Sequence, residues 1–151
     1  MSRRQCSPRQ WLILDREPGF EEWNALRRLE HASGVLLLQP IAAKSRRRLR
    51  RLARTRSLAV ILETNGTAAR VHRQRELTRA LLSRTRLILV SPIYPTRSHP
   101  DWEPLPRMRA ATLARSAGRN AAALGGMNRQ RYAKIAALGF SSWAGISAFR
   151  T

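Results

Sequence analysis

Three short segments in the second half of the chain place glycines, hydroxyl groups or cationic side chains directly after apolar runs. The segment that follows the run 87–91 contains Thr96, Ser98 and His99. Hydroxyl groups and an imidazole are hydrogen-bond donors that suit an anion, and near neutral pH part of a histidine population is charged. These residue types favour phosphate binding, with His99 as a donor to the ligand.

The other two segments follow the next two apolar runs. Gly125 and Gly126 come directly after the run 121–124, and Ile146 and Ser147 end the last run. Paired glycines allow bare main-chain N–H groups to approach a phosphate at the start of the next helix. Each segment alone also fits a structural role, as a stiff connector, a tight turn or a cap. Because all three follow successive strands, we expect one shared phosphate site.

His72 is a second histidine at the end of an apolar run, 68–72, and it precedes a helical pattern that begins at Arg73. Proton transfer near neutrality needs a group that titrates there, and an imidazole does. Two interpretations stay open. His72 either moves a proton at the site or caps the helix that it precedes.

The strands and helices that position these residues are predicted from alternating apolar runs and helical patterns. Strands are predicted at 11–15, 35–39, 58–63, 87–91, 121–124 and 143–147, and helices at 20–31, 42–56, 73–83, 107–117 and 128–138. This alternation is typical of βαβ units around a parallel sheet. In β/α barrels the chemistry lies at the carboxyl ends of the strands, and the loops after the last two strands commonly hold phosphate.

One step of the alternation is missing between the third strand and His72. Residues 64–67 have the composition of a turn, and the run 68–72 follows with no helix between. A parallel crossover needs a dozen or more residues, so this run cannot be the next parallel strand of a normal βαβ unit. An eight-stranded barrel typically takes about 250 residues and compact ones about 200.

The predicted fold is therefore α/β, a TIM-barrel-like parallel β/α fold that is shortened to about six to seven strands. Whether the barrel closes stays open. The 151 residues are enough for one core, so residues 1–151 are predicted to form a single domain. In the first helix the spacing of Phe20, Trp23, Leu26 and Leu29 predicts an apolar stripe against the sheet.

Charge is the unusual feature of the composition, because 29 Lys and Arg residues against 9 Asp and Glu residues give a net charge of +20. Such a field attracts phosphates of any kind. The helix at 42–56, with the sequence KSRRRLRRLARTR, carries much of this charge but has no interleaved aromatic residue for base stacking. Nucleic acid is therefore not the expected partner.

No apolar run approaches the roughly 20 residues of a membrane-spanning helix, so no membrane association is expected. The stretch 11–14 is too short for the hydrophobic region of a secretory signal, and the expected location is the cytoplasm. Cys6 is the only cysteine. Disulfides within the chain and cysteine clusters for zinc are thereby excluded.

The runs VSPIYPTRSHPDWEPLPRMR, ALGGMN and LGFSSWAGISAF resemble the thiamine phosphate synthase/TenI family. Later strands of that family carry a GPxFPTxTK-like loop, an IGGI-like turn and a GVAVISA-like ending. WLILD and GVLLLQ resemble its first and second strands. The resemblance implies a β/α barrel and a reaction of thiamine biosynthesis. In this reaction hydroxymethylpyrimidine diphosphate is coupled to a thiazole phosphate, pyrophosphate is released, and magnesium is required.

The resemblance also assigns roles to individual positions. Thr96 and Ser98 would contact the thiazole substrate, and His99 stands where the family usually has a lysine that meets pyrophosphate. Gly125, Gly126, Ile146 and Ser147 would cradle the thiazole phosphate.

The diphosphate half of the site departs from the family pattern. Gln39 matches the start of a QxREK-like motif, but Pro40, Ile41, Ala42 and Ala43 follow it in place of the arginine and lysine. At the third strand Glu63 is only an approximate substitute for a magnesium-binding aspartate. The fourth unit, with a second such aspartate, has no counterpart. The resemblance thus implies Mg²⁺ for a coupling activity without a full ligand set.

His72 and Glu76 also fit an SxHxxxE-like segment of the family, with Arg70 in place of the serine. In TenI-type members, which tautomerise the thiazole carboxylate phosphate, that histidine serves in proton transfer.

The function expected from all of this is a thiamine-biosynthesis protein that binds a thiazole phosphate, with a synthase-like transferase activity. The alternatives are a TenI-like tautomerase, a non-catalytic phosphometabolite-binding relative and, less favoured, an RNA-binding protein. A pyrimidine diphosphate is the second expected ligand for the coupling reaction. Because the missing unit leaves a sheet edge exposed, a homodimer is also predicted.

Overall fold

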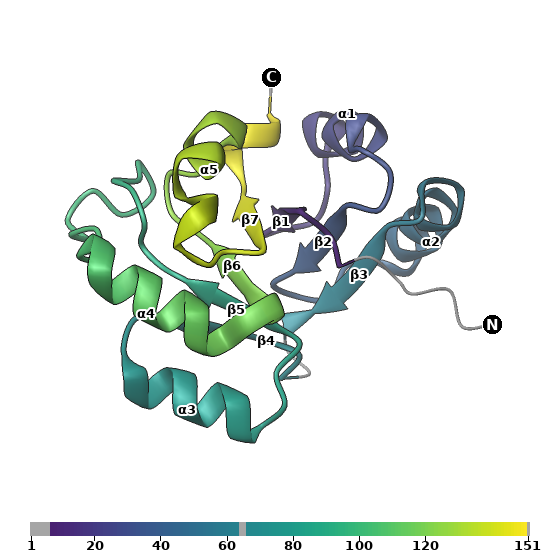
Figure 1. Ribbon diagram of the computed structural model, residues 1–151. Coiled ribbons are helices and arrows are strands. Elements are labelled where there is room, and N and C mark those ends of the chain that lie inside the picture. The colour runs from purple at the N-terminus through teal and green to yellow at the C-terminus, as the bar shows by residue number, and fades with distance from the viewer. Residues whose placement is uncertain (1–6, 64–65, 151) are drawn as a thin grey trace.

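The computed structural model describes residues 7–63 and 66–150, which are organised around one parallel sheet. Its strands are β1 (Gln10–Leu14), β2 (Gly34–Leu37), β3 (Ala59–Leu62), β4 (Ala68–Val71), β5 (Leu87–Val90), β6 (Ala121–Ala123) and β7 (Ser142–Gly145). Their order is β3-β2-β1-β7-β6-β5-β4, and every neighbouring pair is parallel. The sheet curls into a half-barrel, which confirms the predicted shortened β/α fold (Figure 1).

Helices cover the outer face of the curled sheet (Figure 1). They are α1 (Phe20–Arg28), α2 (Ala43–Arg56), α3 (Gln74–Leu82), α4 (Arg107–Ala117) and α5 (Arg129–Ile135), with short 3-10 turns at Gly118–Asn120, Ala136–Leu138 and Ser147–Phe149. None of the helices in this described part of the chain combines the length and apolar character needed to cross a membrane.

The sheet is open between β3 and β4, where the sequence lacks a helical unit. The run at 68–71 is the seventh strand, which agrees with the predicted six to seven strands. β4 pairs with β5 and not with β3, which agrees with the prediction that this run does not continue the sheet from the third strand as a normal βαβ unit. Thr67 donates from Oγ1 to the main-chain oxygen of Leu62 at 2.8 Å, which links the two sheet ends. The other predicted turn residues, Thr64 and Asn65, lie outside the described residues.

The concave side of the sheet is packed by strand side chains alone. Its cluster contains no helix residue and consists of Trp11, Ile13, Leu36, Ile61, Ala68, Leu87, Leu89, Ala122 and Ala144. The indole of Trp11 lies directly on Gly34, where a Cβ would come within 2.1 Å of the ring. Gly34 therefore makes room for the largest side chain of the interior, which fills the half-barrel with a packed core.

Two further clusters join the helices to the convex side of the sheet. In α1 the predicted stripe is correct for Trp23, Leu26 and Leu29, which are buried, but wrong for Phe20, which is 81% exposed. Phe20 is the first residue of the helix, and the buried residues of α1 begin only at Glu22. Leu49 is the buried residue of α2. The arginines of α2 are exposed apart from the half-buried Arg56, and the guanidinium of Arg48 lies 4.2 Å from the centre of the Trp23 ring.

Candidate functional site

The parallel arrangement brings the ends of all seven strands to one edge of the half-barrel. The residues that follow the strands there include Asp15, Gln39, Glu63, His72, Ser91, Gly125 and Ile146. In β/α folds this edge carries the ligand site. The strand order places the ends of β5, β6 and β7 next to one another, whereas β2 and β3 lie towards the far end of the sheet.

The Gly125-Gly126 turn packs directly against the segment that follows β5. Ile93 N–H donates to Leu124 at 2.9 Å, and Tyr94 N–H donates to Gly125 at 3.1 Å. A Cβ on Gly126 would lie 2.4 Å from the carbonyl oxygen of Pro95, which no side chain tolerates. Glycine is therefore required at this position, and Thr96, which follows Pro95, is held beside the turn.

The two glycines present main-chain donors at the strand edge. Gly125 and Gly126 have φ values of 103° and 58°, in the region that favours glycine. Within residues 7–63 and 66–150, the N–H groups of both glycines have no hydrogen-bond acceptor. Successive main-chain N–H groups in a turn of this kind bind anions. The turn is thus a ready donor set for a phosphate.

Arg131 of α5 adds a positive charge to the same turn, which the sequence analysis missed. Its Nη1 donates to the carbonyl oxygen of Gly126, and its guanidinium lies 4.8 Å from the centre of the Tyr94 ring. The side chain thereby holds the turn and the loop after β5 together. The one feature of the sequence that could have indicated Arg131 is its place in the first turn of the helix that follows the two glycines.

The predicted hydroxyl groups lie on an exposed loop. Thr96 is half-buried, and its Oγ1 accepts a hydrogen bond from Ser98 N–H at 3.1 Å. The Thr96 hydroxyl hydrogen is still free to donate to a ligand. Ser98 is exposed beside it. The local turn therefore keeps both residues together, next to Gly126.

Ile146 and Ser147 follow β7, the neighbour of β6, and Ser147 begins a 3-10 turn. Ile146 packs on the interior cluster, whereas Ser147 is exposed and its hydroxyl makes no hydrogen bond to the described residues. The turn after β7 lies close to that after β6, because the oxygen of Met127 is 3.7 Å from the place of a Cβ on Gly145.

An ion-pair network not expected from the sequence fixes the end of β7 to the start of α1. Arg150 lies 3.1 Å from Glu22 and 3.4 Å from Asp15, and Arg16 lies 3.0 Å from Glu22. Glu22 is only 4% exposed. The hydrogen bond from Arg16, main-chain N–H groups and the charge of Arg150 lower the pKa of the Glu22 carboxyl from its usual value.

His72 is fixed at the end of β4 by both its main chain and its ring. Its N–H donates to Oε2 of Glu76, and its Nδ1 lies 2.5 Å from the main-chain oxygen of Ser91. A carbonyl oxygen only accepts, so Nδ1 carries the proton and the neutral ring has its lone pair on Nε2. The helix cap is Arg73, and the His72 ring does not cap α3. The arrangement suits a general base.

His99 reaches the same region through Trp102. The rings of His99 and Trp102 stack at 4.0 Å, and the Trp102 ring meets the His72 ring at 6.1 Å, nearly at right angles. The loop after β5 therefore brings the two predicted catalytic histidines into one aromatic cluster. Trp102 was missed because nothing in its local sequence indicates which ring it contacts.

Gln39 and Glu63 are not brought to this cluster. Gln39 is exposed after β2, and Glu63 lies at the open end of the sheet, with Oε1 4.0 Å from Nε of Arg70. Within the described residues, no group of three or more His, Cys, Asp or Glu side chains converges. A magnesium ion that holds a diphosphate needs carboxylate oxygens. The described side chains therefore do not fit that ion, and Glu63 stays the single candidate ligand.

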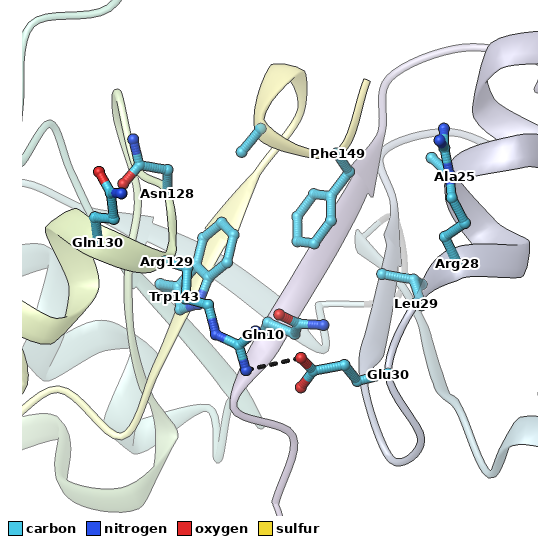
Figure 2. Close-up of a pocket in the computed structure, with 11 residues that line it drawn as sticks. Gln10, Ala25, Arg28, Leu29, Glu30, Asn128, Arg129, Gln130, Trp143 and Phe149 are labelled. Carbon is cyan, nitrogen blue, oxygen red and sulfur yellow. Dashed lines mark ion pairs between the residues drawn. The ribbon is translucent and has the colours of Figure 1, made fainter. Parts of the chain in front are cut away.

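A groove of about 390 Å³ lies on the outer surface, between α1 and α5. Its floor is formed by the stacked rings of Trp143 and Phe149, and the ion pair of Arg129 with Glu30 crosses it (Figure 2). None of the residues predicted to bind substrate lines this groove. It is lined by Asn128, two residues after Gly126, and by Ala148, directly after Ser147, but by none of the predicted donors themselves, so its size alone does not make it the site.

Comparisons with known proteins agree with this arrangement. The solved structure of thiamine phosphate pyrophosphorylase from Pyrococcus furiosus is similar, with a TM-score of 0.69 over 93% of this chain and 86% of that one. Its sequence identity is 17%, so the likeness concerns the fold alone. A search of curated protein sequences found no match. The family model described as thiamine monophosphate synthase matches residues 66–149, more than half of the chain. The chain belongs to the thiamine monophosphate synthase family.

Proposed function

We propose that this chain is a thiamine-biosynthesis protein that binds a thiazole phosphate at the ends of β5, β6 and β7. The observation that carries the proposal is the Gly125-Gly126 turn, whose two N–H groups lack an acceptor among the described residues and whose Gly126 leaves no room for a side chain beside Pro95. The remaining proposed contacts to the phosphate and to the thiazole ring come from Thr96, Ser98, Ile146 and Ser147. Arg131 supplies charge beside the turn.

Tautomerisation of the bound thiazole is the activity that the histidine geometry favours. In this reaction a proton leaves one atom of the ligand and a proton is added at another, so no atoms or electrons are gained or lost overall. His72 Nε2 would accept the proton and return it, because the Ser91 carbonyl holds the other ring nitrogen as the donor. His99 would donate to the ligand's anionic group.

The coupling reaction of the family, with pyrimidine diphosphate as second substrate, is the other candidate activity. It is supported by the family and by the thiazole phosphate half of the site. The diphosphate half has weaker support, because Gln39 is remote from the cluster and Glu63 already lies near Arg70. A protein that binds the thiazole phosphate without converting it is the third reading.

Calorimetry and turnover assays test these readings in sequence. Purified protein is titrated with the thiazole phosphate and with the same thiazole lacking its phosphate. We expect the phosphate to strengthen binding at least about tenfold. Equal or absent binding of the two compounds refutes the proposal. Incubation with each substrate set, with and without magnesium, then separates tautomerase, synthase and a non-catalytic binder.

A further inference from the structure

Trp102 is the only tryptophan with a substantially exposed side chain among the four in the sequence. It is 43% exposed, whereas Trp11, Trp23 and Trp143 are 4–7% exposed. Trp102 belongs to none of the three apolar clusters of the core. Core packing therefore does not account for this large side chain, and its role must be sought in the loop where it lies.

The loop that carries Trp102 is closed by contacts that do not need its side chain. Leu105 N–H donates to the oxygen of Pro92 at 2.8 Å, which joins the two ends of the loop. Leu105 also packs on the core cluster beside α4. Trp102 itself uses only its main-chain N–H, which donates to His99 at 3.1 Å. The indole ring is thus free for another task.

The ring contacts of Trp102 are with the two histidines. It stacks on His99 with an interplanar angle of 11°, and it meets His72 at 81°. Stacking restricts the rotation of an imidazole, and an edge contact limits the directions that a ring can take. A protonated His99 would be held more strongly, since a cation is attracted to the face of an indole.

We propose that Trp102 is a positioning residue that orients His99 and His72 towards a single bound ligand. The inference rests on the proposed function, since the ligand in question is the thiazole phosphate. Trp102 fixes which way the His99 ring faces and closes one side of the His72 ring. The two histidines, which come from different strand ends, then act as one unit at the mouth of the half-barrel.

NMR of the three histidine rings tests the placement without any ligand. His31 is exposed and lies before β2, at the other edge of the sheet, so it serves as the internal reference. Trp102→Leu is compared with Trp102→Phe, which keeps an aromatic ring, and with Phe20→Leu, which removes an exposed ring elsewhere. We expect Trp102→Leu to shift the ring signals of His99 and His72 but not those of His31. Unchanged His72 signals overturn the inference.

Affinity for the thiazole phosphate provides the second arm. We expect Trp102→Leu to weaken binding about tenfold and Trp102→Phe to stay within about threefold of the unmodified chain, because an aromatic pair contributes roughly 0.5–1.5 kcal/mol. Phe20→Leu should bind normally. Full binding by Trp102→Leu overturns the inference, whereas failure of the unmodified chain to bind refutes the proposed function. In that event the NMR signals of the His72 and His99 rings still show whether Trp102 orients the two histidines.

Discussion

The Nδ1 atom of His72 lies 2.5 Å from the main-chain oxygen of Ser91, the residue that follows the neighbouring strand. This contact fixes the ring tautomer through the backbone, independently of any charged side chain. A free Nε2 at the end of β4 follows from it.

Replacing His72 with Ala should abolish proton transfer while leaving binding nearly intact. The phosphate donors belong to β5, β6 and β7, so the affinity for thiazole phosphate should change by no more than a few-fold. The tautomerisation rate should fall roughly 10²–10⁴-fold, the usual contribution of a general base. His31→Ala is the control, and the tautomerisation rate of each variant is followed by NMR of the ligand. Full activity in His72→Ala would rule out the assigned role.

The Gly126→Ala variant should lose both stability and phosphate affinity. Its Cβ would lie 2.4 Å from the Pro95 oxygen, so the turn or the loop must move. Gly118→Ala is the matched control, because Gly118 has a similar φ of 62° against 58° but no atom within 4 Å of the added Cβ.

Urea unfolding gives the comparison. We expect Gly118→Ala to cost about 1–3 kcal/mol of unfolding free energy, from its positive-φ backbone alone. Gly126→Ala should cost roughly 1–3 kcal/mol more, the range for forced overpacking. Equal losses of unfolding free energy in the two variants would show that the close contact with Pro95 does not restrict residue 126.

Glu22 should make stability depend on pH in acid. Its carboxyl has a lowered pKa in the folded chain, through Arg16 first, so the charged form is favoured on folding. Its contribution is fully present above the ordinary pKa of about 4.3 and is lost as the pH falls through the lowered value. Glu22→Gln should be less stable than the parent by about 1–2 kcal/mol near pH 7.

The difference between Glu22→Gln and the parent should shrink as the pH falls below about 4.3 and through the lowered pKa of Glu22, because the carboxyl then takes up a proton and loses its charge. Glu21→Gln is the control, since Glu21 is an exposed neighbour in the same first turn. Urea midpoints at several pH values give the measurement. A stability difference that stays constant at every acid pH at which the parent still folds argues against the ion-pair network as its source.

The open end of the sheet should favour a homodimer. β3 and β4 end the sheet without pairing to each other, and Val60 on β3 is 42% exposed. An uncovered strand edge is a template for pairing with another chain, and lysine at an edge discourages it. We expect light scattering to show a dimer that Val60→Lys shifts to monomer, while Met108→Lys on α4 does not. A strictly monomeric parent at high concentration contradicts this expectation.

The sequence was sufficient for the parallel fold because its signals are local. The buried run Leu87–Val90 and the helix Arg107–Ala117 have the periodicity of their elements, and the structure places them at or within a residue of the predicted bounds. The run 68–71 was hard to assign because no helix separates it from the third strand, but α3 joins it to β5 as an ordinary βαβ unit. Phe20 was misplaced because spacing alone does not show where a helix leaves the sheet.

The candidate site was predictable only where strand ends bear its residues. Gly125 and His72 follow strands directly, so their placement at one edge follows from the parallel order. The contact of Gly126 with Pro95 and the stacking of Trp102 on His99 depend on the path of a long loop. Loop paths are set by tertiary packing rather than by periodicity, and the sequence therefore gave these residues no partner.

Amide NMR of the ¹⁵N-labelled chain, titrated with thiazole phosphate, shows directly whether the phosphate binds at the Gly125-Gly126 turn. We expect saturable shifts centred on the N–H signals of Gly125 and Gly126, with smaller shifts at Thr96 and Ser147. Gly126→Ala should weaken them and Gly118→Ala should not. Shifts confined to the groove between α1 and α5, around Gln10 and Arg129, or no saturable shift at Gly125 and Gly126, would contradict a phosphate site at the strand ends.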